Sequence, residues 1–214
     1  IHRYLAALIG LLAAVTCTFG NLAAYGQTNI KRMLAYSTIA HAGYMMMAVP
    51  AAIVLAGTQP QFASAAIAAL IFYIGVYLFM NLGAFAIVAF LRDAAATEQI
   101  AEYAGLLRSA PVTVVCFATI LISLIGIPPL AGFVAKFFLF AALVEAGGPL
   151  LIALLVIGGI NSVISLVYYL RVVRVMTMEP EPAGGVPVRL AVAPVLYTVA
   201  ITLPVALLGL YSSG

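Results

Sequence analysis

The chain has 214 residues, of which 66% are hydrophobic and only 7% are charged. A soluble domain normally carries about 25% charged and about 45–50% apolar residues, so this chain cannot cover a water-exposed surface with polar groups. The composition therefore excludes a soluble globule, a disordered chain and a nucleic-acid-binding domain, and the formal charge of +3 alone indicates little. We expect an integral membrane protein in contact with the lipid bilayer.

Charged residues divide the sequence into uncharged runs that are long enough to cross a bilayer. About 20 apolar residues, at roughly 1.5 Å per residue, span a hydrocarbon core that is roughly 30 Å thick. The runs lack the regular apolar–polar alternation of a transmembrane β-barrel, so the spans are helical. The sequence predicts an all-α integral membrane protein, a bundle of six transmembrane helices forming a single membrane domain over residues 1–214. The predicted spans lie near 4–25, 33–53, 62–91, 111–144, 150–175 and 191–211.

The basic residues of the loops are unevenly distributed between the two sides of the membrane. With six spans the connections alternate sides, and one side receives Lys31, Arg32, Arg92, Arg108, Arg171, Arg174 and Arg189. The other side receives Arg3 alone. The positive-inside rule makes the first side cytoplasmic, so the C-terminus is predicted to face the outside.

The fourth predicted span contains a helix break. As one straight helix, residues 111–144 would be about 50 Å long, which is too long for a modestly tilted span. Two prolines remove two backbone donors and leave the carbonyls of Leu124 and Ile125 without helical partners. Flanking glycines permit non-helical dihedral angles, and broken helices at bilayer depth usually line a cavity. The residues of the predicted break are Pro128, Pro129, Gly126 and Gly132.

Lys136 lies about two turns beyond this break, between two apolar half-spans. An ionisable side chain inside a bilayer is costly and usually has a role in transport. Burial disfavours the charged ammonium, so Lys136 is a candidate for loading and releasing a proton. The alternative is a snorkelling lysine whose amine reaches an interface.

His41 is the second candidate for proton transfer. It follows Arg32 by nine residues, which places it about 14 Å along the helix from the charged rim and therefore near the middle of the bilayer. Ser37 and Tyr44 share its helix face, and histidine titrates near neutral pH. The alternative is a neutral histidine that is hydrogen-bonded across a helix interface.

Six polar residues are further candidates for a proton path, and two of them are Ser37 and Tyr44 beside His41. Tyr73, Tyr77 and Asn81 recur at four-residue spacing on one face of the third span, where such side chains can hold water. Glu145 lies where the fourth span reaches the outer interface. For the three residues of the third span, the alternative is that they form interhelical hydrogen bonds. For Glu145, the alternative is a solvated carboxylate at the membrane rim.

These motifs, in this order, resemble the antiporter-like membrane subunits of respiratory complex I, the proton-pumping NADH–quinone oxidoreductase, and are most similar to subunit N. Asn29, which follows Gln27 and Thr28, indicates subunit N, because sister subunits and the related sodium/proton antiporters more often carry Asp there. The matching segments are 20–22, 27–44, 77–85, 126–137 and 161–171. They cover nearly the whole sequence.

The resemblance implies that the chain is the C-terminal part of a longer subunit, six of fourteen helices, and that a first proton half-channel precedes Ile1. It identifies Lys136 with the proton-channel lysine of the family's discontinuous helix, and His41 with its membrane-embedded histidine. The implied function is proton translocation coupled to quinone reduction. The implied location is a bacterial inner (plasma) membrane.

The same resemblance makes the chain a subunit of a translocating enzyme without a redox site of its own. The sequence contains no Gly-rich phosphate loop, no metal-spaced Cys/His cluster and no catalytic triad, so we expect no cofactor-binding or metal site. NAD, flavin, iron–sulfur clusters and quinone are expected in partner subunits, and the partners are other membrane subunits of the complex. Two alternatives stay open, a subunit of a cation/proton antiporter or membrane-bound hydrogenase, and a non-conducting scaffold.

Overall fold

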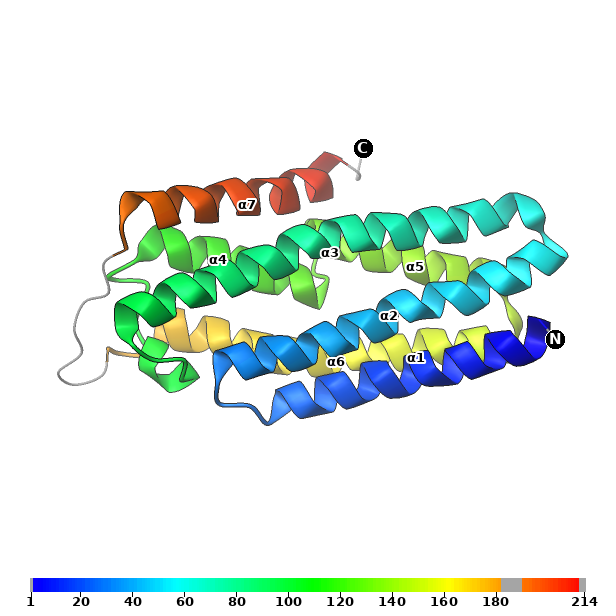
Figure 1. Cartoon of the computed structure of the whole chain (residues 1–214), viewed down its shortest axis with the longest axis horizontal. Helices are drawn as coiled ribbons and strands as arrows, with labels where there is room; N and C mark the ends of the chain where they lie inside the picture. The colour runs from blue at the N-terminus through cyan, green and yellow to red at the C-terminus, as the bar shows by residue number, and fades with distance from the viewer. Residues whose placement is uncertain (1, 182–189, 212–214) are drawn as a thin grey trace.

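The computed structural model describes residues 2–181 and 190–211, and its regular elements there are helices. In chain order they are α1 (His2–Tyr25), α2 (Ile30–Thr58), α3 (Pro60–Ala95), the 3₁₀ helix η1 (Ile100–Tyr103), α4 (Pro111–Ile125), α5 (Ala131–Ala146), α6 (Gly148–Met178) and α7 (Val192–Tyr211). The α-helices run along the longest axis of the molecule (Figure 1). The predicted all-α fold is confirmed.

Five helices in the described part of the chain are long and apolar enough to cross a membrane, namely α1, α2, α3, α6 and α7. The place of the predicted fourth span is taken by two shorter helices, α4 and α5, which follow each other end to end (Figure 1). The prediction of a discontinuous fourth span is therefore confirmed. The largest difference from the predicted bounds is at the end of α2, which continues to Thr58 where the prediction ended near residue 53.

Local sequence explains where several helices begin. Asn29 caps α2, because its side-chain oxygen accepts a hydrogen bond from the backbone N–H of Arg32 at 2.9 Å. Helices α3 and α4 each begin with a proline, Pro60 and Pro111, in the first turn, where the missing N–H has no helical acceptor to lose. Pro50 lies inside α2, a position that transmembrane helices tolerate when neighbouring groups satisfy the freed carbonyl.

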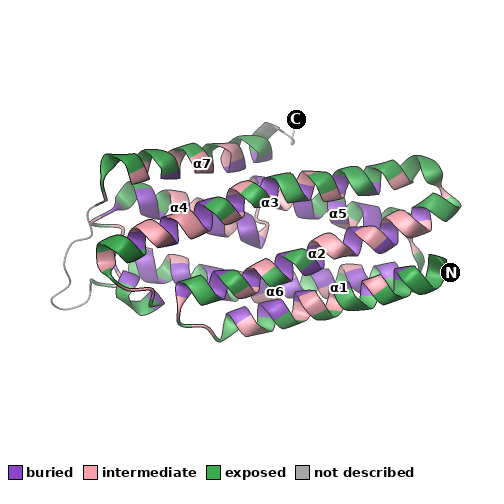
Figure 2. Ribbon diagram, in the orientation of Figure 1, coloured by how far each residue is buried: buried purple, intermediate pink, exposed green. Residues whose placement is uncertain are grey.

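The buried face of each helix points into the bundle, and the outward faces carry large apolar side chains (Figure 2). Leu8 of α1, Leu78 of α3 and Val163 of α6 are all more than half exposed. An apolar exterior of this extent fits contact with lipid or with other membrane helices rather than with water.

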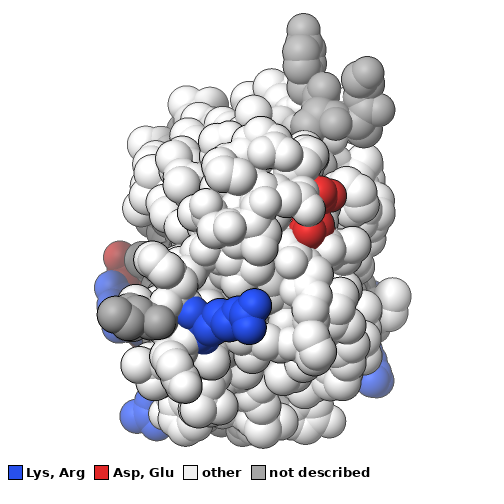
Figure 3. Space-filling model, turned by 90° about the vertical axis from the view of Figure 1, so that its right-hand side faces the viewer, with Lys and Arg blue, Asp and Glu red and all other residues white. Residues whose placement is uncertain are grey.

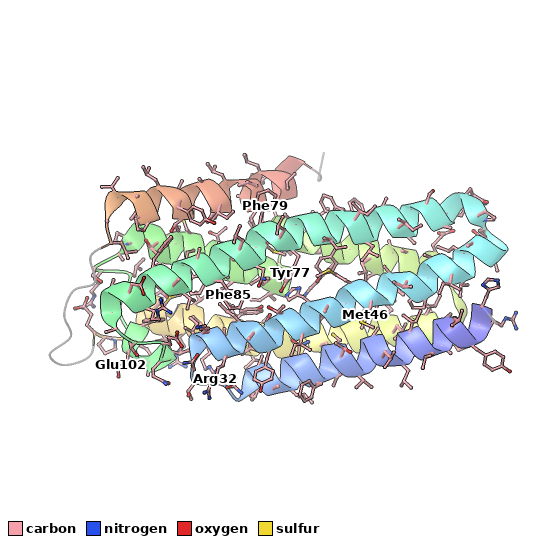
Figure 4. All side chains as sticks on the ribbon, viewed as in Figure 1. Arg32, Met46, Tyr77, Phe79, Phe85 and Glu102 are labelled. Atoms are coloured by element: carbon pink, nitrogen blue, oxygen red, sulfur yellow. The ribbon has the colours of Figure 1, made fainter. Side chains whose placement is uncertain are left out.

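Charged side chains gather at the end of the bundle that contains the α1–α2 connection. Figure 4 labels Arg32 and Glu102 at this end. Here Lys31 pairs with Glu98 at 3.7 Å, and the Asn29 amide donates to the same carboxylate at 3.0 Å. Figure 3 views the opposite end, whose visible surface is mostly uncharged. This unequal distribution is the pattern on which the predicted orientation depends.

Candidate functional site

The break between α4 and α5 is formed by residues 126–130. Gly126 ends α4 in a left-handed conformation, with φ of 89°, and its N–H donates to the carbonyls of Ile122 and Ser123. A glycine is suited to this position because a side chain disfavours such a φ. At the start of α5, the N–H of Gly132 donates to the Ser123 hydroxyl at 3.0 Å, which joins the two half-helices.

The amine of Lys136 lies inside this break. Its Nζ donates to the carbonyl of Ile125 at 2.9 Å and to that of Leu124 at 3.2 Å. These are the two carbonyls that Pro128 and Pro129 leave without helical donors. The lysine therefore caps the C-terminal end of α4, where the partial negative charge of the helix favours a cation.

Lys136 is only 5% exposed, so its amine does not reach either surface of the chain. This burial excludes the snorkelling alternative for the chain as described. The fold thus holds an ionisable nitrogen within the apolar bundle, at a point where two backbone carbonyls have no helical N–H donor. That arrangement stabilises the ammonium form by hydrogen bonds while withholding water from it.

Two residues from other helices complete the surroundings of the amine. Lys136 Nζ lies 4.5 Å from the centre of the Tyr44 ring, within the range of a cation–π contact. The Ser162 hydroxyl of α6 lies 3.4 Å from the same nitrogen. The lysine of α5 is therefore contacted by groups from α2, α4 and α6.

His41 lies in the interior between α2 and α3 and is 2% exposed. Its Nδ1 is 3.0 Å from the Tyr73 hydroxyl, and its ring stacks on Tyr77 with centroids 4.9 Å apart. Figure 4 shows Tyr77 directed into the bundle from α3. The Tyr44 ring is 5.9 Å from the histidine ring and 4.5 Å from Lys136 Nζ, so Tyr44 neighbours both candidate residues.

Three predicted path residues lie outside this cluster. Ser37 is hydrogen-bonded to the Tyr169 hydroxyl of α6, and Asn81 is 3.3 Å from the Thr38 hydroxyl. Both are contacts between helices, and a role of either residue in a proton path stays a prediction. Glu145 is exposed and lies nine residues beyond Lys136, about 14 Å along α5.

The surroundings of Glu145 are apolar. It lines an open groove of about 470 Å³ whose other walls include Phe62, Phe72 and Phe138. Within the described residues, no hydrogen bond or ion pair joins Glu145 to Lys136. Its role in a proton path stays a prediction.

Sequence reasoning missed Ser123 and Ser162 as neighbours of the lysine. Both are uncharged polar residues in apolar runs, a signal shared by many residues that serve only in helix packing. In a buried network elsewhere in the bundle, the Asn21 amide donates to the Asn161 side chain at 3.1 Å. The Tyr168 hydroxyl donates to the Asn21 oxygen at 3.0 Å, and together these bonds join α1 to α6.

Known proteins are similar to this chain in sequence and in fold. Residues 2–165 match the protein family described as "NADH:quinone oxidoreductase/Mrp antiporter, TM". The chain belongs to this family. Family membership and the apolar helices together make it an integral, multi-pass membrane protein.

Two curated relatives show which branch of the family is similar. The chain is 45% identical over 208 residues to NADH-quinone oxidoreductase subunit N 2 of Sorangium cellulosum, a match covering 95% of this chain and 38% of that protein. It is 45% identical over 191 residues to NADH-quinone oxidoreductase subunit N of Anaeromyxobacter sp., covering 87% of this chain and 35% of that protein. The chain therefore spans less than two fifths of the length of these relatives.

Solved structures share the fold. A chain of respiratory complex I from Thermus thermophilus with bound Aureothin superposes with a TM-score of 0.77 at 32% identity, over 96% of this chain and 44% of that one. A chain of the Mrp complex from Dietzia sp. superposes with a TM-score of 0.84 at 22% identity, over 99% of this chain and 45% of that one. The second likeness shows a common fold alone.

Proposed function

We propose that this chain forms the lysine-bearing second half of a proton-translocating subunit of the subunit N type in an NADH–quinone oxidoreductase. The observation that carries the proposal is the Lys136 amine, buried at a helix break and bound to the carbonyls of Leu124 and Ile125. Buried ionisable groups in membrane proteins characteristically serve transport. The 45% identity to subunit N proteins supports this branch of the family over the antiporters.

Lys136 acts in this proposal as the last proton carrier toward the outside. The two carbonyls and the end of α4 stabilise the ammonium, while desolvation opposes it, so a modest change in nearby charge shifts the balance between the two forms. His41 transmits that change through Tyr44 and bound water. Quinone reduction in partner subunits supplies the driving force.

The redox chemistry belongs to the partners. NAD, flavin, iron–sulfur clusters and quinone would be held by other subunits, and this chain would contribute proton movement without a redox group of its own. Its neighbours would be other membrane subunits of the complex and lipid. The membrane is a bacterial inner membrane, with the C-terminus outside.

The deciding experiment replaces Lys136 with alanine, and separately with arginine, in the complete complex reconstituted into liposomes. Proton pumping should be lost in both variants, because arginine keeps the charge but does not release its proton. Coupled NADH–quinone turnover should fall as well. Unchanged pumping in Lys136→Ala would refute the proposal and support a non-conducting scaffold.

Two further measurements test the rest of the proposal. The subunits that copurify with the complete protein should be those of a quinone reductase, whereas antiporter or hydrogenase subunits would favour the rival assignment. A cysteine introduced at Gly57, an exposed residue in the last turn of α2 beside the connection to α3, should react with a membrane-impermeant maleimide added from the outside. Reaction from the cytoplasmic side alone would reverse the orientation.

A further inference from the structure

The groups around the Lys136 amine differ in what hydrogen bonds they can make. The carbonyls of Leu124 and Ile125 only accept, so they bind the charged amine but offer nothing to the lone pair of a neutral one. The Ser162 hydroxyl, at 3.4 Å, both donates and accepts. It is the one hydroxyl among the described residues with a hydrogen-bond contact to this nitrogen.

The Ser162 hydroxyl also contacts the hydroxyl of Tyr44. The Tyr44 hydroxyl is 3.2 Å from Ser162 Oγ and donates to the Gly158 carbonyl at 3.3 Å. The Tyr44 side chain is 1% exposed, so its position is set by packing rather than by solvent. Ser162 thus lies between an amine on α5 and a phenol on α2.

The hydrogen bonds that join these three side chains can be arranged in two opposite directions. With a charged amine, Lys136 donates to Ser162, Ser162 donates to Tyr44, and Tyr44 donates to the Gly158 carbonyl. With a neutral amine, Tyr44 donates to Ser162, and Ser162 donates to the lone pair of Lys136. Rotation of two O–H bonds converts one arrangement into the other, and no heavy atom has to move.

We propose that Ser162, oriented by Tyr44, is a positioning residue that holds the Lys136 amine at the helix break in both of its protonation states. The two N–H groups of the neutral amine can still donate to the two carbonyls, but without Ser162 its lone pair would have no donor. Proton release then leaves the nitrogen in place for the next proton. The inference rests on the proposed proton-transfer role of Lys136, and in it no proton passes through Ser162.

The test compares Ser162→Ala, Ser162→Thr and Ser165→Ala in the complete, reconstituted complex. Ser165 is the matched control, because it lies on the same helix and its hydroxyl donates to the Ser162 backbone carbonyl at 2.8 Å rather than to the lysine. Loss of one hydrogen bond of ordinary strength should slow pumping and coupled turnover about two- to tenfold in Ser162→Ala. Ser162→Thr keeps the hydroxyl and should restore the rate.

A solvent isotope effect separates positioning from structural damage. If the neutral amine is no longer held, proton exchange at Lys136 limits turnover, and the ratio of rates in H₂O and D₂O should rise in Ser162→Ala. Tyr44→Phe keeps the ring but removes the orienting hydroxyl, so it should change both readouts in the same direction by a smaller amount. Ser165→Ala should match the wild type.

The outcomes distinguish the two proposals. A wild-type rate and isotope effect in Ser162→Ala, beside lost pumping in Lys136→Ala, would overturn the positioning role and leave the proposed function intact. A slow Ser162→Ala with an unchanged isotope effect, not restored by threonine, would also overturn it, since packing alone explains that result. Normal pumping in Lys136→Ala would instead remove the proposed function.

Discussion

Gly126 is the residue at which a single methyl group should disturb both the stability of the bundle and its lysine. Its φ of 89° lies in the left-handed region, which costs a residue with a side chain about 1–3 kcal/mol. A Cβ at this position would lie 2.9 Å from Cδ of Lys136 and 3.6 Å from its Cε. Because those atoms belong to a flexible side chain, the lysine will shift rather than the backbone.

The shift carries a functional consequence. Moving Cδ draws Nζ away from the Ile125 carbonyl, now 2.9 Å distant, and from the Leu124 carbonyl at 3.2 Å. Gly126→Ala should therefore destabilise the native state by about 1–3 kcal/mol and also slow proton pumping. The first effect comes from the backbone and the second from the displaced amine.

The assay needs a glycine where a methyl group is harmless. Gly159 lies in α6 with no atom within 4 Å of its ideal Cβ, and alanine there should stabilise the helix by up to about 1 kcal/mol. Thermal inactivation and pumping of the two variants are compared in the complete complex. If Gly126→Ala is as heat-resistant and as active as Gly159→Ala, neither the strain nor the displacement of the amine is real.

Three further changes test other parts of the site and fold. Tyr73→Phe removes the hydroxyl bound to His41 at 3.0 Å and should slow pumping less than His41→Ala does; equal losses would show that His41 acts only through Tyr73. A hydrogen bond from Asn29 lowers the pKa of the Glu98 carboxyl below its ordinary 4.5. The Glu98 carboxylate therefore stabilises the folded state fully above about pH 4.5, and this stabilisation is lost as the pH falls through the lowered pKa of the folded state. Glu98→Gln should therefore reduce the thermal midpoint at pH 7 but not at pH 3, and an equal deficit at both pH values would contradict this sign. Gly209→Ala places a methyl group against the backbone of the helix break and should loosen the packing of α7, measured as a lower thermal midpoint; an unchanged midpoint would count against that contact.

Much of the fold followed from hydrophobicity alone. In a bilayer each backbone polar group must be satisfied within its own segment, so uncharged runs of sufficient length become helices. The break was predictable for an equally local reason, since Pro128 and Pro129 cannot donate to the carbonyls one turn earlier. The burial of Lys136 followed from the apolar residues on both sides of it.

The neighbours of the lysine were not predictable in this way. Ser162 is 26 residues from Lys136 in the chain, and Tyr44 is 92 residues away (136 − 44), so their meeting depends on how α2, α5 and α6 pack. Periodicity places a residue on a helix face but does not say which helix that face meets. The four-residue stripe of α3 illustrates the limit, since Tyr73 and Tyr77 contact His41 whereas Asn81 contacts Thr38.

Sequence by itself determined that this protein is a helical membrane bundle, where its helices lie, and which of them is interrupted, because these properties depend on the solvation of backbone and side chains within single segments. Tertiary structure alone decided that the freed carbonyls are occupied by the Lys136 amine and that a serine and a tyrosine from two other helices surround it. Such contacts depend on the crossing angles and rotations of packed helices, which result from many weak interactions distributed over the whole bundle.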